Sequence, residues 1–121
     1  MRFISIYRHA ARADHAPSQK MQQEMGKFME ECVRAGVLLA TDGLGPTTAR
    51  DLKVRHANGQ YQVTDGPFTE AKEVIGGFAI MQCKTRDELL EWTRRFLAIA
   101  GDGECEIHQL ADQSPLEFIK K

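Results

Sequence analysis

The segment LKVRHANGQYQVTD, residues 52–65, decides the fold of this chain. Apolar and polar residues alternate on both sides of Asn58-Gly59, a pattern typical of two paired strands. Asn-Gly favours a two-residue type I′ turn, because both central positions of that turn need a positive φ angle. Counting outward from the turn gives three facing pairs: His56 with Tyr61, Val54 with Val63, and Leu52 with Asp65. The sequence therefore predicts a β-hairpin with these six side chains on one side.

The residues before the hairpin predict a β-α-β unit. Residues 2–8 are rich in β-branched and aromatic side chains and predict a first strand that is apolar on both faces. Pro17-Ser18 then opens a helix, and Gly36 ends it. Residues 37–41 predict a second strand. The helix has apolar residues at helical spacing, namely Met21, Met25, Phe28, Met29 and Cys32.

The residues after the hairpin predict a second β-α-β unit. Residues 76–83 form a strand-like run that is apolar on both sides, as expected of a central strand. Residues 85–88 have the form of a capping box, and the helix that follows ends at Gly101. Residues 104–110 predict the last strand, and residues 112–121 a polar tail. Three apolar residues are candidate anchors for that tail: Leu116, Phe118 and Ile119.

This order of elements predicts one α+β domain over residues 1–121. We expect a ferredoxin-like antiparallel sheet with two helices on one face and an inserted β-hairpin. The first and central strands are apolar on both faces, so the sheet face away from the helices needs a cover. An identical sheet from a second copy is the simplest cover, because a bare apolar face is an aggregation hazard and homodimers are the commonest oligomers. We therefore expect a homodimer.

The composition excludes several classes of function. Sixteen basic and seventeen acidic residues give a net charge of -1, which argues against nucleic acid as a partner. No apolar run approaches the ~20 residues that cross a bilayer, and Met1 opens into a strand-like pattern rather than a signal peptide. We therefore expect a cytoplasmic protein with no membrane partner.

The residues that usually bind metals or cofactors show no recognisable spacing. Cys32, Cys83 and Cys105 lie far apart among apolar neighbours, which predicts buried, inert thiols. His15 and His108 have no metal-ligand spacing to another candidate ligand. The motifs of nucleotide binding, zinc proteases and serine hydrolases do not occur. The sequence therefore predicts no metal and no cofactor.

Residues 63–73, VTDGPFTEAKE, followed by Gly76-Gly77-Phe78, resemble the DGPF-domain branch of the YCII-related family. The Gly43-Leu44 turn and the Asn-Gly hairpin resemble it too, so the similarity covers nearly the whole chain. The resemblance implies a ferredoxin-like fold and a dimeric α/β barrel. Most members have no assigned reaction, some lie beside sigma factors of the extracytoplasmic-function class, and related proteins include a dehydrochlorinase of chlorinated hydroquinones. In the wider family a His-Asp pair near a cleft is proposed as catalytic, whereas residues 18–35, the helix predicted here, contain no histidine.

Asp65 is the first candidate for chemistry, because it closes the hairpin and precedes Gly66-Pro67. Its carboxylate is a candidate general base or ligand-binding group, and the alternative is that it caps the turn. Phe68 is either an aromatic wall of a site or a core anchor. Glu70 and Lys72 either line a site for a small polar aromatic ligand or form a solvated ion pair. The ligand-binding candidates are together Asp42, Gly66, Phe68, Glu70 and Lys72.

His9 ends the first predicted strand and Asp42 ends the second, so a β-α-β unit can bring them to the same end of the sheet. A histidine-carboxylate pair there would do acid-base work near neutral pH. The alternative is that His9 is a surface residue or a turn partner.

The sequence predicts a small dimeric protein that binds an organic ligand in a cleft near residues 65–68. One form of this hypothesis is a cofactor-independent lyase or isomerase with Asp65 and His9 as proton-transfer groups. The alternative is a non-catalytic ligand-sensing or partner-binding module, for example one linked to sigma-factor regulation. The sequence alone does not decide whether the protein is an enzyme.

Overall fold

The computed structural model describes residues 1–10, 18–45, 50–68 and 73–119. It confirms the predicted α+β class, with two helices, an antiparallel sheet and a hairpin between the two halves. The elements follow in the order β1 (Arg2–Ala10), α1 (Gln19–Arg34), β2 (Leu38–Gly43), β3 (Leu52–Ala57), β4 (Gln60–Asp65), β5 (Glu73–Gln82), α2 (Arg86–Ala100), β6 (Glu104–Gln109) and a 3-10 helix, η1 (Pro115–Phe118).

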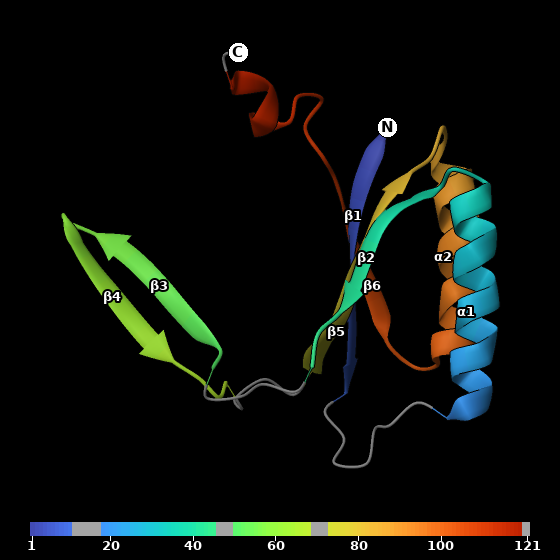
Figure 1. The fold of residues 1–121 in the computed structure, drawn as a ribbon, viewed down its shortest axis with the longest axis horizontal. Coiled ribbons are helices and arrows are strands. Elements are labelled where there is room, and N and C mark those ends of the chain that lie inside the picture. The colour runs from blue at the N-terminus through green and yellow to red at the C-terminus, as the bar shows by residue number, and fades with distance from the viewer. Residues whose placement is uncertain (11–17, 46–49, 69–72, 120–121) are drawn as a thin grey trace.

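The main sheet has four antiparallel strands in the order β2-β5-β1-β6, and both helices lie side by side against one of its faces (Figure 1). Residues that pair directly across antiparallel strands point to the same face. Phe3 pairs with Met81 and Ser5 with Ala79, and these side chains face the helices. The alternate residues of β1 and β5 therefore point to the opposite face.

The buried core fills the space between the helices and one end of the sheet. It consists of Phe3, Val37, Met81, Cys83 and Leu89, with Ala79, Trp92 and Ile107 packed against it. Apolar burial of this kind is the main driving force of folding. The core therefore fixes the helices to the sheet at the end where β1 begins.

The contact between the two helices is centred on Arg95 of α2. Its guanidinium forms an ion pair with Glu31 of α1 and lies over the rings of Phe28, at 5.2 Å, and Trp92, at 4.9 Å. The hydrogen bond from Arg95 lowers the pKa of Glu31. Arg95 thus connects the helices on their outer side by both charge and ring stacking.

The N-termini of both helices have the caps that the sequence predicts. Ser18 Oγ accepts a hydrogen bond from the Met21 N–H at 3.1 Å, and Thr85 Oγ1 accepts one from the Glu88 N–H at 3.1 Å. Glu88 also accepts a hydrogen bond from the Lys84 N–H at 3.0 Å. Ser18 and Thr85 thus satisfy backbone donors that the helices themselves leave unpaired, and Glu88 binds the residue just before the cap of α2.

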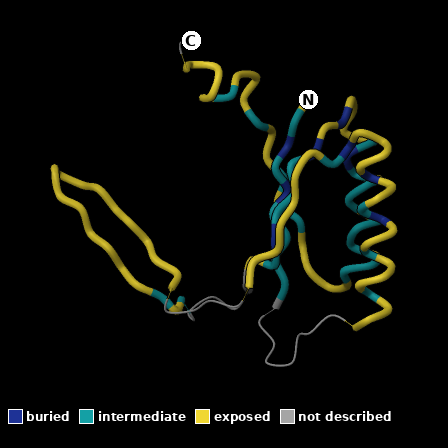
Figure 2. The backbone as a smooth tube through the Cα atoms, viewed as in Figure 1, coloured by how far each residue is buried: buried dark blue, intermediate teal, exposed yellow. Residues whose placement is uncertain are grey.

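The hairpin of β3 and β4, called the arm from here on, is a separate two-stranded sheet. Asn58 and Gly59 have φ angles of 54° and 76°, as a type I′ turn requires. The arm projects on the side of the main sheet away from the helices (Figure 1), and every strand residue in it is exposed (Figure 2). All three predicted pairs are confirmed: Leu52 with Asp65, Val54 with Val63, and His56 with Tyr61.

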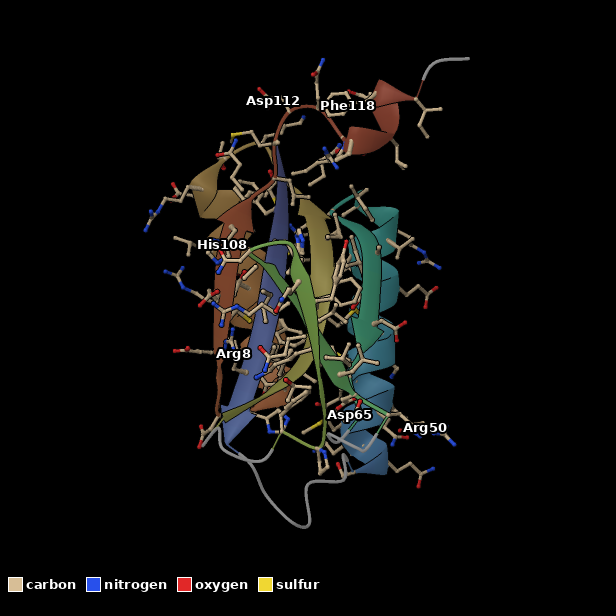
Figure 3. All side chains as sticks on the ribbon, turned by 90° about the vertical axis from the view of Figure 1, so that its left-hand side faces the viewer. Arg8, Arg50, Asp65, His108, Asp112 and Phe118 are labelled. Atoms are coloured by element: carbon tan, nitrogen blue, oxygen red, sulfur yellow. The ribbon has the colours of Figure 1, made fainter. Side chains whose placement is uncertain are left out.

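The face of the main sheet that points away from the helices is called the open face. Figure 3 views the molecule from this side, with Arg8 and His108 labelled. By their pairing, four large apolar side chains lie at its centre, namely Ile4, Ile6, Phe78 and Ile80. Its β6 side has Glu104, Glu106 and His108. The structure thus has the two-sided apolar strands that the sequence predicts.

Two features of the structure differ from the sequence prediction. The β1–β5 register shifts between Tyr7 and Arg8, so that Tyr7 pairs with Gly77 and Arg8 with Ile75. The alternation of apolar and polar residues in the sequence does not predict this register shift. The tail residues Leu116, Phe118 and Ile119 do not anchor η1 to the core, since they are 73%, 68% and 67% exposed.

No helix among the described residues combines the length and the apolar character that crossing a bilayer requires.

The three cysteines lie in apolar surroundings. Cys32 and Cys83 are buried, as predicted, and Cys105 is half-buried. Burial raises the pKa of Cys32 to about 11 and also raises the pKa of Cys83 and Cys105. Because the thiolate is the reactive form, these thiols are poor nucleophiles in the folded chain.

The close approach of β2 and β5 predicts a position-specific effect of alanine. A Cβ on Gly77 would lie 2.6 Å from the backbone oxygen of Asp42, whereas a Cβ on Gly43 has its nearest neighbour at 3.7 Å. We expect Gly77→Ala to lower the free energy of unfolding by about 1–3 kcal/mol, and Gly43→Ala to change it by less than about 0.5 kcal/mol. Urea denaturation followed by circular dichroism measures both, and equal losses would contradict this explanation.

The raised pKa of Cys32 predicts slow alkylation. A rise from the ordinary value of 9.0 to about 11 lowers the thiolate fraction at pH 8 about 100-fold. We expect iodoacetamide to modify Cys32 at least that much more slowly in the folded chain than in urea, where all three cysteines react. Peptide mass spectrometry resolves the sites, and rapid labelling of Cys32 in the folded chain would refute the prediction.

Candidate functional site

A pocket of about 420 Å³ lies between the helices and the main sheet. It is called the helix–sheet pocket. Its floor comes from β1, β2, β5 and β6, and its roof from α1 and α2. Its volume falls within the range of small-molecule sites, which is roughly 300–1,000 Å³.

The pocket exists because side-chain size falls along the helix-facing side of the sheet. On β5 the successive helix-facing residues are Met81, Ala79 and Gly77, and on β1 Phe3 is followed by Ser5. The large residues fill the space between the layers and form the core. The small residues leave it open, and Ser5, Gly77 and Ala79 line the pocket floor.

The roof of the pocket is apolar and adaptable. Met25 and Met29 of α1 lie opposite the sheet, and Trp92 and Phe96 of α2 complete the roof with Phe28. Methionine side chains are flexible and polarisable, so they adjust to the shape of a bound molecule. Aromatic rings add broad flat surfaces that pack against another ring.

Three hydroxyl groups of the pocket lining donate their protons to backbone oxygen atoms. Tyr7 donates its hydroxyl proton to the backbone oxygen of Asp102 at 3.4 Å, Thr41 to that of Phe78 at 2.8 Å, and Thr93 to that of Leu89 at 2.8 Å. Each hydroxyl oxygen keeps lone pairs after its proton is used. A ligand with an N–H or O–H group would therefore complement this lining.

Among the described residues, the pocket lining has no lysine, arginine or histidine, and Asp42 is its only acidic residue. Asp42 Oδ1 accepts a hydrogen bond from the backbone N–H of Gly43 at 2.9 Å. Nothing in the lining would therefore compensate the desolvation of an anionic ligand, which is costly in apolar surroundings. The lining favours an uncharged molecule.

His9 and Asp42 are not brought together as a pair. Asp42 pairs with Phe78, and Phe78 pairs with Ile6. Because residues that pair directly point to the same face, Asp42 lies on the open face of the sheet, in line with these two residues. The His9 ring instead lies against the Tyr7 ring, with 5.7 Å between centroids. His9 is close to Gly76 of the pocket lining, where an added Cβ would be 2.9 Å from its Cδ2 atom.

The remaining predicted site residues gather at the base of the arm. Asp65 is exposed there as the last residue of β4 (Figure 3), and the Gly66 N–H donates to the backbone oxygen of Asp51 at 2.6 Å. Phe68 lies beneath Lys53, whose Nζ atom is 4.5 Å from the ring centroid. None of Asp65, Gly66 and Phe68 lines the helix–sheet pocket. Their roles in ligand binding or catalysis stay predictions.

Glu70 and Lys72 lie outside the described residues. Within the residues that are described, no group of three or more histidine, cysteine, aspartate or glutamate side chains could hold a metal ion.

Sequence reasoning missed the residues that form the pocket. Tyr7, Trp92 and Phe96 are not among the site residues that the sequence predicts. A signal was present in the small helix-facing residues Gly77 and Ala79, which leave space in a strand otherwise rich in large side chains. That signal needs the strand register to be read, because the register decides which residues face the helices.

Comparisons with known proteins identify the family of the chain. The chain matches the family model described as the YCII-related domain over residues 1–113, a range that extends from β1 beyond β6. It is similar to an uncharacterised protein of Rhizobium meliloti (strain 1021), with 34% identity over 101 residues, 83% of this chain and 81% of that protein. The chain belongs to the YCII-related family.

Proposed function

We propose that this protein binds a small organic molecule in the helix–sheet pocket. The observation that carries the proposal is the pocket itself, which small residues on β1 and β5 leave open beneath a roof of aromatic and methionine side chains. A core optimised only for stability would fill such a space, because interiors pack to the density of organic crystals. The resemblance of residues 63–73 also supports the proposal that the protein belongs to the DGPF-domain branch of the family.

The ligand is uncharged, flat and partly aromatic, with at least one N–H or O–H group. The rings of Phe28, Trp92 and Phe96 favour a flat apolar body. The hydroxyl oxygen of Thr41, whose proton is donated to the backbone oxygen of Phe78, favours a donor on the ligand. The described residues of the pocket lining include no cationic side chain, which disfavours a carboxylate or phosphate as ligand.

Binding without chemistry is the form of the proposal that the pocket supports best. Asp42 is the one acidic residue among the described residues of the lining, and burial raises the pKa of the lining residues Cys32 and Cys105. Acid-base catalysis generally needs a positioned donor and acceptor near the reacting atoms. The non-catalytic role would be ligand sensing, for example in the sigma-factor regulation that the family resemblance implies.

Catalysis by a cofactor-independent lyase or isomerase is the second candidate. It is favoured by His9, whose ring lies against Tyr7 beside the Gly76 end of the pocket lining. Asp65 could take part only if the base of the arm comes close to a bound molecule. Recovery of a pocket ligand in altered form, and loss of that conversion in His9→Ala, would favour this candidate over sensing.

We also propose that the protein is a cytoplasmic homodimer, joined through the open face. Ile4, Ile6, Phe78 and Ile80 form a contiguous apolar group there by their pairing. A sheet with one face packed on helices normally has a polar second face if that face is solvated. This composition therefore supports a second copy as its cover.

The charge preference of the pocket predicts discrimination between two related probes. We expect 1-anilinonaphthalene, which is neutral and has one N–H group, to bind about tenfold or more tightly than its 8-sulfonate, since the sulfonate would be desolvated without a cationic partner. Fluorescence titration of each probe measures this ratio. Equal affinities, or a preference for the sulfonate, would contradict the proposed ligand class.

A variant with a larger side chain on the pocket floor tests whether the probe binds in the helix–sheet pocket. Ala79→Leu should weaken binding of 1-anilinonaphthalene about tenfold or more, because the added atoms occupy the pocket floor. Ala98→Leu is the control at an exposed position of α2 outside this lining, and should leave binding unchanged. Circular dichroism would establish that both variants fold. Unweakened binding by folded Ala79→Leu would place the probe elsewhere.

The proposed dimer predicts that a charge on the open face weakens association. Ile6→Glu would place a carboxylate in the interface beside Phe78 and Glu106, and should raise the dimer dissociation constant about tenfold or more. Val33→Glu, at an exposed position of α1, is the matched control and should leave it unchanged. Sedimentation equilibrium measures both, and a monomeric wild type would refute the dimer.

A further inference from the structure

Among the described residues, the strands of the arm pair only with each other. The arm is a separate two-stranded sheet whose twelve strand residues are all exposed. An isolated two-stranded hairpin is only marginally stable in water. The exposure of Val54, Tyr61 and Val63 is 60%, 76% and 59%, although large apolar residues of this kind usually pack against another surface.

One side of the arm is apolar and the other polar. The apolar side has the facing pair Val54 and Val63, with the stacked rings of His56 and Tyr61, 4.5 Å apart, beside the turn. The polar side has Arg55 opposite Gln62 and Lys53 opposite Thr64. This division is typical of a hairpin that lays one side on an apolar surface and keeps the other in water.

Three exposed apolar surfaces lie on the same side of the chain. The arm and the segment that contains η1 both stand on the side of the main sheet opposite the helices, and the open face lies between them (Figure 1). The η1 segment adds Leu116, Phe118 and Ile119, which are all more than 65% exposed. The arm extends away from the open face of its own chain and leaves that face uncovered (Figures 1 and 2).

A second copy fits this arrangement in size and symmetry. The apolar side of the arm has six positions, the open face has about twelve, and the η1 segment adds three exposed apolar residues. Together they give about twenty residues per chain. A standard protein–protein interface has ~20–30 residues on each side. A twofold axis brings the same surfaces of two chains together. Each arm then reaches the face that the other chain leaves bare.

We propose that the arms are exchanged in the homodimer, so that the apolar side of each arm packs against the open face of the second copy. This inference rests on the dimer proposed above and adds which elements make it. It assigns Val54, Tyr61 and Val63 to the interface and leaves Lys53, Arg55 and Gln62 in water. The partner is a second copy of this chain.

Matched charge variants on the two sides of the full-length arm test the exchange. We expect Val54→Glu to raise the dimer dissociation constant about tenfold or more, and Gln62→Glu, which adds the same charge to the polar side, to change it less than about twofold. Sedimentation equilibrium measures both constants. A wild-type dimer that neither variant weakens would overturn the arm exchange while leaving the open-face dimer standing.

Cross-linking identifies the surface that the arm contacts. Tyr61→p-benzoylphenylalanine, irradiated in an equal mixture of ¹⁴N and ¹⁵N chains, should give cross-links of mixed isotope composition between the arm and residues of β1 or β5. Mixed composition proves that the link joins two chains. Cross-links confined to single chains, or directed to the helices of a second chain, would overturn the proposal even if Val54→Glu weakened association.

Discussion

The antiparallel pairing of β1 with β5 is the constraint on which the other features depend. Its register places Phe3 beside Met81 and Ser5 beside Ala79 on the helix side, and Ile6 beside Phe78 on the other side. Side chains alternate strictly along a strand, so a slip by one residue would exchange the two faces. The apolar core, the helix–sheet pocket and the open face all follow from this one alignment.

The sequence predicts the arm in detail because the information is local. Asn58-Gly59 sets the turn, and the turn sets the register of every pair up to Leu52 and Asp65. The two helices are predicted for a similar reason, since their caps and apolar spacing lie within a few residues of one another. Most of the fold class is therefore readable without a structure.

The candidate site is not readable in the same way. A pocket depends on the distance between two layers, and that distance is set by residues far apart in the chain, such as Met81, Leu89 and Phe3. The expected His9 and Asp42 pair was based on the ends of strands alone. The observed register assigns Asp42 to the open face and leaves His9 against Tyr7. The tail residues illustrate the same limit, because apolar character does not specify which surface a side chain meets.

The two proposed activities use opposite faces of β5. Gly77 and Ala79 line the floor of the pocket, whereas the side chains of Phe78 and Ile80 belong by their pairing to the open face. Ligand binding and association thus depend on alternate residues of one short segment. Adjacent residues of a strand point to opposite faces, so a mutation intended for one activity has to be made at a residue whose side chain points to the corresponding face.

Trp92 gives the pocket an optical property. It is the only tryptophan in the sequence, and it lies in the pocket roof with the Arg95 guanidinium 4.9 Å from its ring and the Phe28 ring 6.0 Å away. Indole emission from the native chain therefore originates from one position. The wavelength and intensity of this emission depend on the polarity around the indole ring. A molecule that enters the helix–sheet pocket would therefore change the fluorescence of the unlabelled protein.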